Sequence, residues 1–84
     1  MSHESKYIIA SIGGVQTPVV FSENLVHADV AMALAGYGRV SGAGFCIVDD
    51  EGYHCYGEST SLNIKSNYEV DSKILNRMLG VDPL

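Results

Sequence analysis

The 84-residue sequence has little charge, and positive charge is the scarcest. Charged residues make up 18% of the chain, whereas a typical globular domain has about 25%. Five Lys and Arg residues are scattered among ten Asp and Glu residues, which gives a net charge of −5. Nucleic-acid phosphates are bound by clustered Lys and Arg, so we expect no nucleic-acid partner. The acids are too dispersed to imitate DNA, because only Asp49-Asp50-Glu51 forms a run.

Long apolar runs and cysteines are also scarce. No apolar stretch is long enough to cross a bilayer, and the first residues lack the basic and apolar regions of a signal peptide. Cys46 and Cys55 could form only one disulfide, whereas a small secreted fold usually needs several to be stable. These absences predict a cytoplasmic protein with no membrane partner and with two free, buried thiols.

Apolar residues and glycines are plentiful. The chain is 46% hydrophobic and contains nine glycines, a composition that excludes intrinsic disorder. Its length predicts a single domain over 1–84, with loosely ordered tails at 1–6 and 81–84. So short a chain buries only about 60% of its unfolded surface. Because its charges are too few to cover that surface, the composition favours self-association.

The first part of the chain predicts a β-hairpin. Two strand-like runs, 7–12 and 15–21, flank Gly13-Gly14, which is a two-residue turn signal. Pro18 lies in the second run and cannot donate a hydrogen bond to a neighbouring strand. The second strand is therefore expected at the edge of a sheet, or with a bulge at Pro18.

A second hairpin is predicted from Arg39 to Tyr56, turning at Asp49-Asp50-Glu51-Gly52. Gly42 and Gly44 share one face of its first strand, where a helix or another backbone can approach closely. A four-residue turn would place Cys46 opposite Cys55, whereas a three-residue loop with a glycine bulge would place Cys46 opposite Tyr56.

Two helices are expected. The first runs from about Glu23 to Ala35 with Ser22 as its cap, and it is apolar on nearly all sides. A helix of this kind must be covered on more than one face, so we expect a homodimer. The predicted interface consists of Leu25, Val26, Asp29, Met32 and Ala33.

The second helix begins near Asn67, within the capping-box pattern Ser66-Asn67-Tyr68-Glu69, and ends at Gly80. Its apolar stripe consists of Val70, Ile74, Leu75, Met78 and Leu79, and the residues predicted to point outward are Asp71, Lys73, Asn76 and Arg77. With a polar loop at 57–61 and a short strand at 62–64, the predicted order is β-β-α-β-β-α. This order indicates an α+β fold with an antiparallel sheet of about four strands and two helices.

No set of residues indicates catalysis. The glycines at 36–44 follow a helix and precede a strand, which is the reverse of a phosphate-binding loop. His54 alternates with Cys55 along its strand, so the two point apart and cannot readily share a metal ion. Nothing places His27 beside either thiol as a base. We therefore predict no catalytic residue, no metal and no cofactor.

One segment could bind a ligand. Its carboxylate, hydroxyls and aromatic ring suit a small polar molecule, although short polar side chains also satisfy loop backbone groups. The candidate ligand-binding residues are Tyr56, Glu58, Ser59 and Ser61.

The segments 55–66, Pro18-Val19-Val20-Phe21 leading towards His27, and 41–45 together resemble small uncharacterised proteins of tailed phages and prophages. The resemblance implies a bacterial cytoplasm and an accessory role, and it carries no functional residue. We expect a non-enzymatic, homodimeric interaction module that binds a host or phage macromolecule. The alternative is a protein that binds or sequesters a small polar ligand near residues 56–61.

Overall fold

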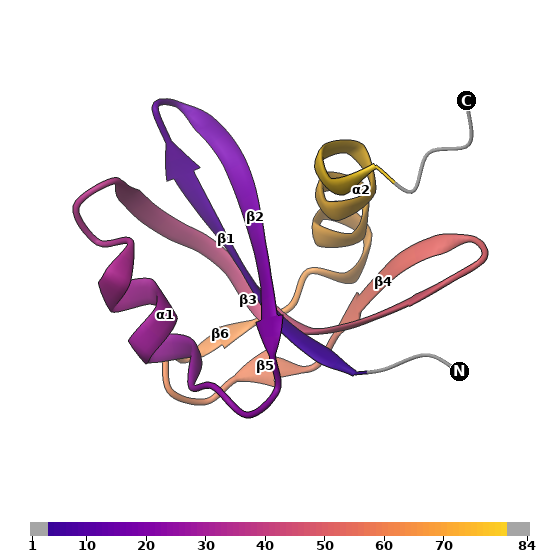
Figure 1. The fold of residues 1–84 in the computed structure, drawn as a ribbon, viewed down its shortest axis with the longest axis horizontal. Helices are drawn as coiled ribbons and strands as arrows, with labels where there is room; N and C mark the ends of the chain where they lie inside the picture. The colour runs from indigo at the N-terminus through magenta and orange to yellow at the C-terminus, as the bar shows by residue number, and fades with distance from the viewer. Residues whose placement is uncertain (1–3, 81–84) are drawn as a thin grey trace.

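The computed structural model describes residues 4–80 and confirms the α+β fold. An antiparallel sheet of order β2-β1-β3-β4 carries two helices and a small ribbon, β5-β6 (Figure 1). The elements are β1 (Ser5–Ile12), β2 (Val15–Ser22), α1 (His27–Ala33), β3 (Gly38–Asp49), β4 (Gly52–Tyr56), β5 (Glu58–Ser59), β6 (Ile64–Lys65) and α2 (Tyr68–Leu79). Thus β1 begins inside the expected tail at 1–6, and the expected tail at 81–84 lies outside the described residues.

The first hairpin forms as predicted, and β2 is an edge strand. Gly13 and Gly14 have φ values of 61° and 81°, which a two-residue hairpin turn requires. In such a hairpin the pair flanking the turn is hydrogen-bonded, and bonded and non-bonded pairs then alternate. Pro18 lies opposite Ile9, at a non-bonded position, so its missing N–H faces outward. This edge therefore has one donor fewer for a further strand.

The core lies between α2 and one face of the sheet. Glycines on β3 make room for it, because a Cβ at Gly44 would lie 2.8 Å from the Tyr56 carbonyl oxygen. A Cβ at Gly42 would lie 3.1 Å from the Asp71 carboxylate. The close approach expected on this face is thus confirmed. The buried cluster consists of Tyr7, Ile9, Cys46, Cys55, Ile74 and Leu75.

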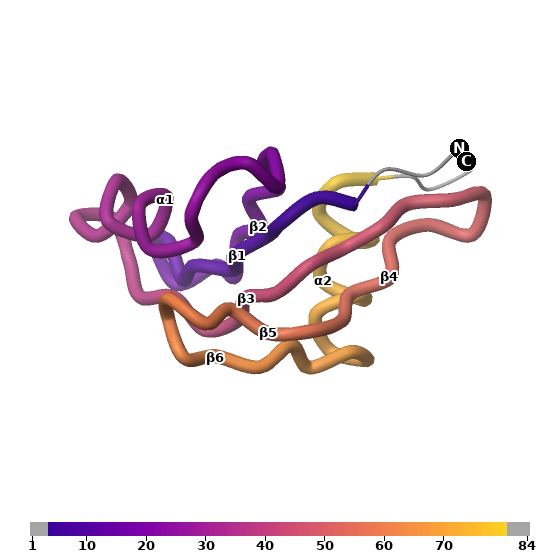
Figure 2. The backbone as a smooth tube through the Cα atoms, turned by 90° about the horizontal axis from the view of Figure 1, so that it is seen from below, coloured from indigo at the N-terminus to yellow at the C-terminus, as the bar shows by residue number. Residues whose placement is uncertain are grey.

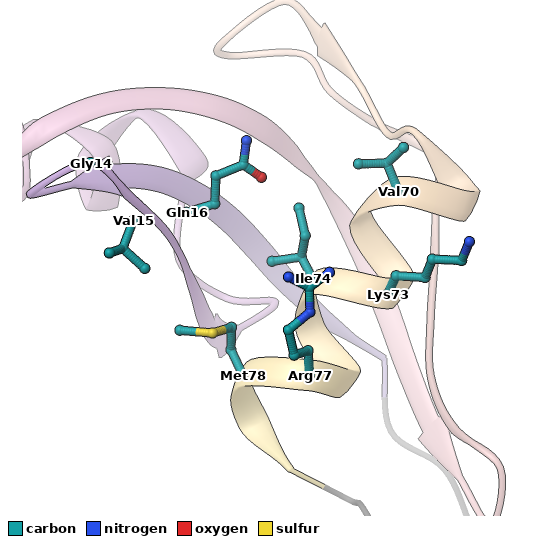
Figure 3. A pocket seen from close by; sticks show the side chains of 8 residues that line it. All are labelled: Gly14, Val15, Gln16, Val70, Lys73, Ile74, Arg77 and Met78. Atoms are coloured by element: carbon teal, nitrogen blue, oxygen red, sulfur yellow. The ribbon is translucent and has the colours of Figure 1, made fainter.

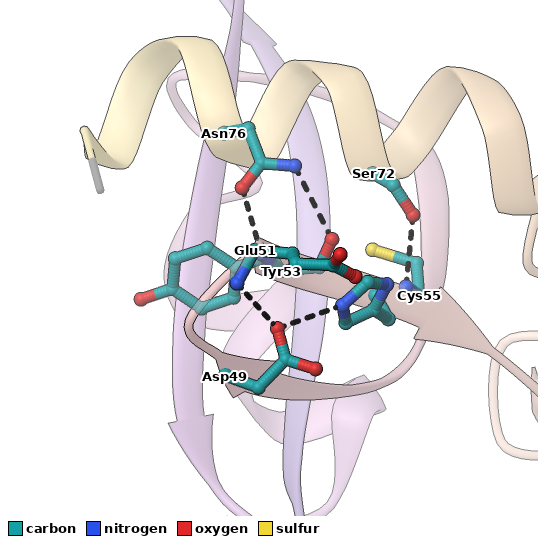
Figure 4. Close-up of polar contacts among 7 residues, drawn as sticks. Asp49, Glu51, Tyr53, Cys55, Ser72 and Asn76 are labelled. Atoms are coloured by element: carbon teal, nitrogen blue, oxygen red, sulfur yellow. Dashed lines mark hydrogen bonds and ion pairs between the residues drawn. The ribbon is translucent and has the colours of Figure 1, made fainter. Parts of the chain in front are cut away.

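Side chains of α2 pair with the outer edge of β4 (Figure 4). Asn76 Oδ1 accepts from the Tyr53 N–H at 2.7 Å, and its Nδ2 donates to the Tyr53 carbonyl oxygen at 3.2 Å. Ser72 Oγ accepts from the Cys55 N–H at 2.9 Å. The prediction that Asn76 points outward is therefore wrong. Its amide takes the place that a neighbouring strand would occupy.

The predicted bounds of the first helix are wrong. α1 covers His27–Ala33, and Val26 at its N-cap makes no side-chain cap bond. Ser22 Oγ instead accepts from the Asn24 N–H at 3.1 Å, and the Leu25 N–H donates to the Ser22 carbonyl oxygen. This turn competes with the helix start. In both views α1 and α2 lie well apart along the molecule (Figure 2).

Candidate functional site

A groove lies between the tip of the β1–β2 hairpin and the outer side of α2 (Figure 3). Its volume is about 540 Å³, within the range of roughly 300–1,000 Å³ that is usual for binding pockets. The groove exists because α2 packs mainly beside β4 and leaves the β2 end of the sheet less covered. It is lined by Gly14, Val15, Gln16, Val70, Lys73, Ile74, Arg77 and Met78.

The groove is apolar with a positive rim. Val15, Val70 and Met78 are 52%, 49% and 45% exposed. Lys73 and Arg77, one helical turn apart, supply its formal charge. Among residues 4–80 the single ion pair is His54–Asp49, so neither groove cation has a carboxylate partner there. The wall is therefore suited to a ligand that is both apolar and acidic.

The sequence predicted both elements that line the groove, the first hairpin and the second helix, but not the groove between them. Val70 and Met78 belong to the predicted apolar stripe of α2, yet both are exposed. The missing information was where the tip of the first hairpin would lie relative to α2. The apolar stripe of α2 is wider than the part of it that the sheet covers. This difference becomes visible only once the order of the strands is known.

A second, smaller cavity of about 190 Å³ lies beside β5. Of the predicted ligand-binding residues, Glu58 and Ser61 line it. Ser59 is fully buried, and its Oγ accepts from the Leu62 N–H at 3.2 Å. The Tyr56 ring stacks on Phe45, which lines the cavity, at a centroid distance of 6.1 Å. The structure thus brings two of the four side chains to one site.

A polar cluster is buried beneath α2. Tyr7 Oη donates to Asp71 Oδ2 and lies 2.6 Å from Ser66 Oγ, while the Asn67 N–H donates to the same carboxylate at 3.1 Å. Asp71 is 5% exposed, so the prediction that it points outward is wrong. Burial, followed by the hydrogen bond to Asp71, raises the pKa of Tyr7 well above its usual value. The cluster ties β1 to α2 through the buried side chains of Tyr7 and Asp71.

The two cysteines face each other across β3 and β4, as the four-residue turn predicts. Both thiols are free. Burial, with the neighbouring Cys55 as a second cause, raises the pKa of Cys46 to about 12. Burial also raises the pKa of Cys55 to about 11, against the opposing hydrogen bond to Ser72. Thiols held protonated in this way are poor nucleophiles.

We expect the free energy of unfolding to fall as pH rises above about 9, because unfolded thiols titrate at about pH 8.5 and unfolded Tyr at about pH 10. Folded Cys46, Cys55 and Tyr7 retain most of their protons up to about pH 10, because burial raises their pKa values, so deprotonation favours the unfolded chain. Each group that loses its proton only in the unfolded chain lowers the free energy of unfolding by about 1.4 kcal/mol per pH unit. Denaturant melts from pH 8 to 11 measure the slope. The double variant Cys46→Ala, Cys55→Ala should flatten it, and an equal slope would contradict the assignment.

One group of side chains among residues 4–80 has the spacing of metal ligands. Asp49, Glu51 and His54 lie at and beside the β3–β4 turn, with their ligand atoms within 4.8 Å of one another. Figure 4 shows Asp49 and Glu51 at this turn. His54 Nε2 is 3.0 Å from Asp49 Oδ1, and this hydrogen bond is the main cause of the lowered pKa of Asp49. Asp49 and Glu51 are exposed and His54 is partly so. The contacts account for the turn without an ion.

The predicted interface residues lie on the surface around α1. Leu25, Val26, Asp29, Met32 and Ala33 are all exposed, and Met32 is 76% exposed. The homodimer stays a prediction. Sedimentation of the wild-type chain should then give a dimer, and Met32→Glu or Ala33→Glu should give a monomer because a charge would enter an apolar interface. Unchanged masses in both variants would contradict this placement.

No family model, curated protein or solved structure matches the chain. The resemblance to phage proteins therefore stays a prediction that these comparisons do not support. Within residues 4–80, no helix is both long and apolar enough to cross a membrane.

Proposed function

We propose that this domain is a non-enzymatic module that binds a short segment of another protein, of a host or a phage, in the groove beside α2. The observation that carries the proposal is the charge of the groove. A chain of net charge −5 places two of its five Lys and Arg residues, Lys73 and Arg77, on an apolar groove. Complementary charge selects partners and steers their approach. The partner segment therefore carries Asp or Glu beside apolar side chains.

The dimensions favour a short amphipathic segment. The groove follows α2 from Val70 to Met78, a length of about 12 Å at 1.5 Å per residue. Amphipathic segments dock through apolar side chains spaced by one helical turn. A contact of this length buries a small area, which is typical of weak and transient complexes. We expect micromolar affinity.

The two edge strands, β2 and β4, are poorly suited to pairing with a strand of the partner, which favours binding through the groove. Pro18 offers no N–H on the β2 edge, and Asn76 and Ser72 occupy backbone groups of the β4 edge. The raised pKa values of the two buried thiols keep them protonated and unreactive, which is consistent with a protein that binds its partner without a covalent step.

The proposal is tested by selecting random ten-residue peptides against the immobilised full chain. The selected peptides should combine Asp or Glu with Leu, Ile or Phe. Their binding should fall at least tenfold in the double variant Lys73→Glu, Arg77→Glu. The double variant Arg39→Glu, Lys65→Glu is the matched control, because it changes the net charge equally at two exposed cations outside the groove lining.

Basic peptides, or equal binding by the groove variant, would contradict the proposal. Self-association of the wild-type chain that the groove variant abolishes would instead assign the groove to a second copy.

A further inference from the structure

The smaller cavity is a site separate from the groove, with a different lining. Its walls come from β1, β3, the start of α1, β5 and the turn after β5. The lining residues are Lys6, Val26, His27, Phe45, Glu58, Thr60 and Ser61. None of them lines the groove, so an inference about this cavity stands independently of the proposed function.

The floor of the cavity is held by buried contacts. His27 is 3% exposed, and its Nε2 donates to the Gly44 carbonyl oxygen at 2.7 Å. The His27 ring packs edge-on against Phe21 and Phe45, with centroids 5.6 and 5.8 Å away. Phe45 is in turn stacked on Tyr56. Because these rings fix one another, the cavity has a preformed apolar floor.

A cation is held at the wall. Lys6 Nζ donates to the Leu25 carbonyl oxygen at 2.7 Å and lies 5.8 Å from the centroid of the Phe45 ring. This hydrogen bond uses one of its three protons. The other two can be donated to a ligand in the cavity.

An anion and two hydroxyls complete the wall. Glu58 lines the same cavity, and among residues 4–80 no cation lies within ion-pair distance of it, although Lys65 is its cross-strand neighbour. Ser61 Oγ accepts from the Ala28 N–H at 3.1 Å, which leaves its own proton to donate. The Thr60 hydroxyl can donate or accept. One small cavity therefore presents both signs of charge.

We infer that this cavity binds a small zwitterion, namely a free α-amino acid with a short side chain. The ligand carboxylate accepts from Lys6 and Ser61, its ammonium group donates to Glu58 and Thr60, and its side chain lies on Phe45. A volume of about 190 Å³ corresponds to roughly six water molecules, which suits an amino acid with a short side chain such as alanine or serine.

Thermal unfolding of the full chain tests this inference, since a ligand bound to the folded state raises its melting temperature. With 20 mM L-alanine or L-serine, and a dissociation constant of about 5 mM, we expect a rise of about 5 °C. Glu58→Gln and Lys6→Met should each remove it. Glu51→Gln, a neutralised acid at the β3–β4 turn, should keep it. Non-specific solute effects act equally on all four chains, so the difference between chains measures binding.

Single-charge analogues complete the test. Acetate and methylammonium each satisfy half of the site and should give less than a fifth of the shift. An equal shift with either ion would show a site for one charge and overturn the inference. It would also be overturned by no shift with either amino acid, or by a shift that persists in Glu58→Gln and Lys6→Met. None of these results depends on peptide binding in the groove.

Discussion

Tyr7→Phe is expected to lower the free energy of unfolding by about 3 kcal/mol, because hydrogen bonds to buried charged groups are costly to lose. The change removes one oxygen from a fully buried ring. That oxygen donates to Asp71 and contacts Ser66, and Asp71 then keeps one protein donor, the Asn67 N–H. In a domain of this size, the loss corresponds to a fall in melting temperature of about 15 °C.

A double-mutant cycle isolates the contact. Asp71→Asn in the Tyr7→Phe background replaces the carboxylate by a neutral amide, so it should cost less there than in the wild-type chain. We expect a coupling energy above about 1 kcal/mol, since the two side chains touch. Urea melts of the four chains measure it. Additive losses would mean that Tyr7 and Asp71 stabilise the fold independently.

Asn76→Asp is expected to destabilise the protein by about 2–3 kcal/mol at pH 7, more than Asn76→Ala does. The wild-type amide satisfies both the N–H and the carbonyl oxygen of Tyr53. An introduced carboxylate still accepts from the N–H, but it faces the carbonyl oxygen without a proton to donate. The alanine variant leaves the two groups to water and introduces no repulsion.

The pH dependence distinguishes this mechanism from a general loss of packing. Once protonated, the introduced carboxyl can donate to the Tyr53 carbonyl oxygen, so its pKa in the folded state should be raised. The stability of Asn76→Asp relative to wild type should therefore recover as pH falls from 7 to 4. The difference between Asn76→Ala and wild type should stay nearly constant. If the stability of both variants changed with pH in the same way, the result would contradict the pairing of the Asn76 amide with the Tyr53 backbone.

The sequence predicted the elements that depend on local patterns. Gly13-Gly14 specified a hairpin turn, and the apolar spacing with Gly80 specified α2, whose end has φ 61° at that glycine. Pro18 indicated the edge strand for a local reason, the missing N–H. Each of these features is determined by a residue and its immediate neighbours.

What could not be predicted depends on contacts distant in sequence. Asp71 and Asn76 are polar positions on an amphipathic helix, and solvent exposure is the ordinary expectation for them. Their partners, Tyr7 and Tyr53, lie 64 and 23 residues away. The late start of α1 likewise follows from the turn at Ser22 and the burial of His27 against Gly44, a backbone oxygen that carries no signal in the sequence.

The most direct test of the groove is to titrate the ¹⁵N-labelled full chain with one peptide that alternates turns of Leu and Glu, and to follow its amide resonances. The expected result is saturable shifts at Gly14–Gln16 and along α2 from Val70 to Met78, weakened by added salt because two cations contribute. A peptide with Lys in place of Glu should leave the spectrum unchanged. Shifts centred on α1, or equal shifts with the Lys peptide, would contradict the account.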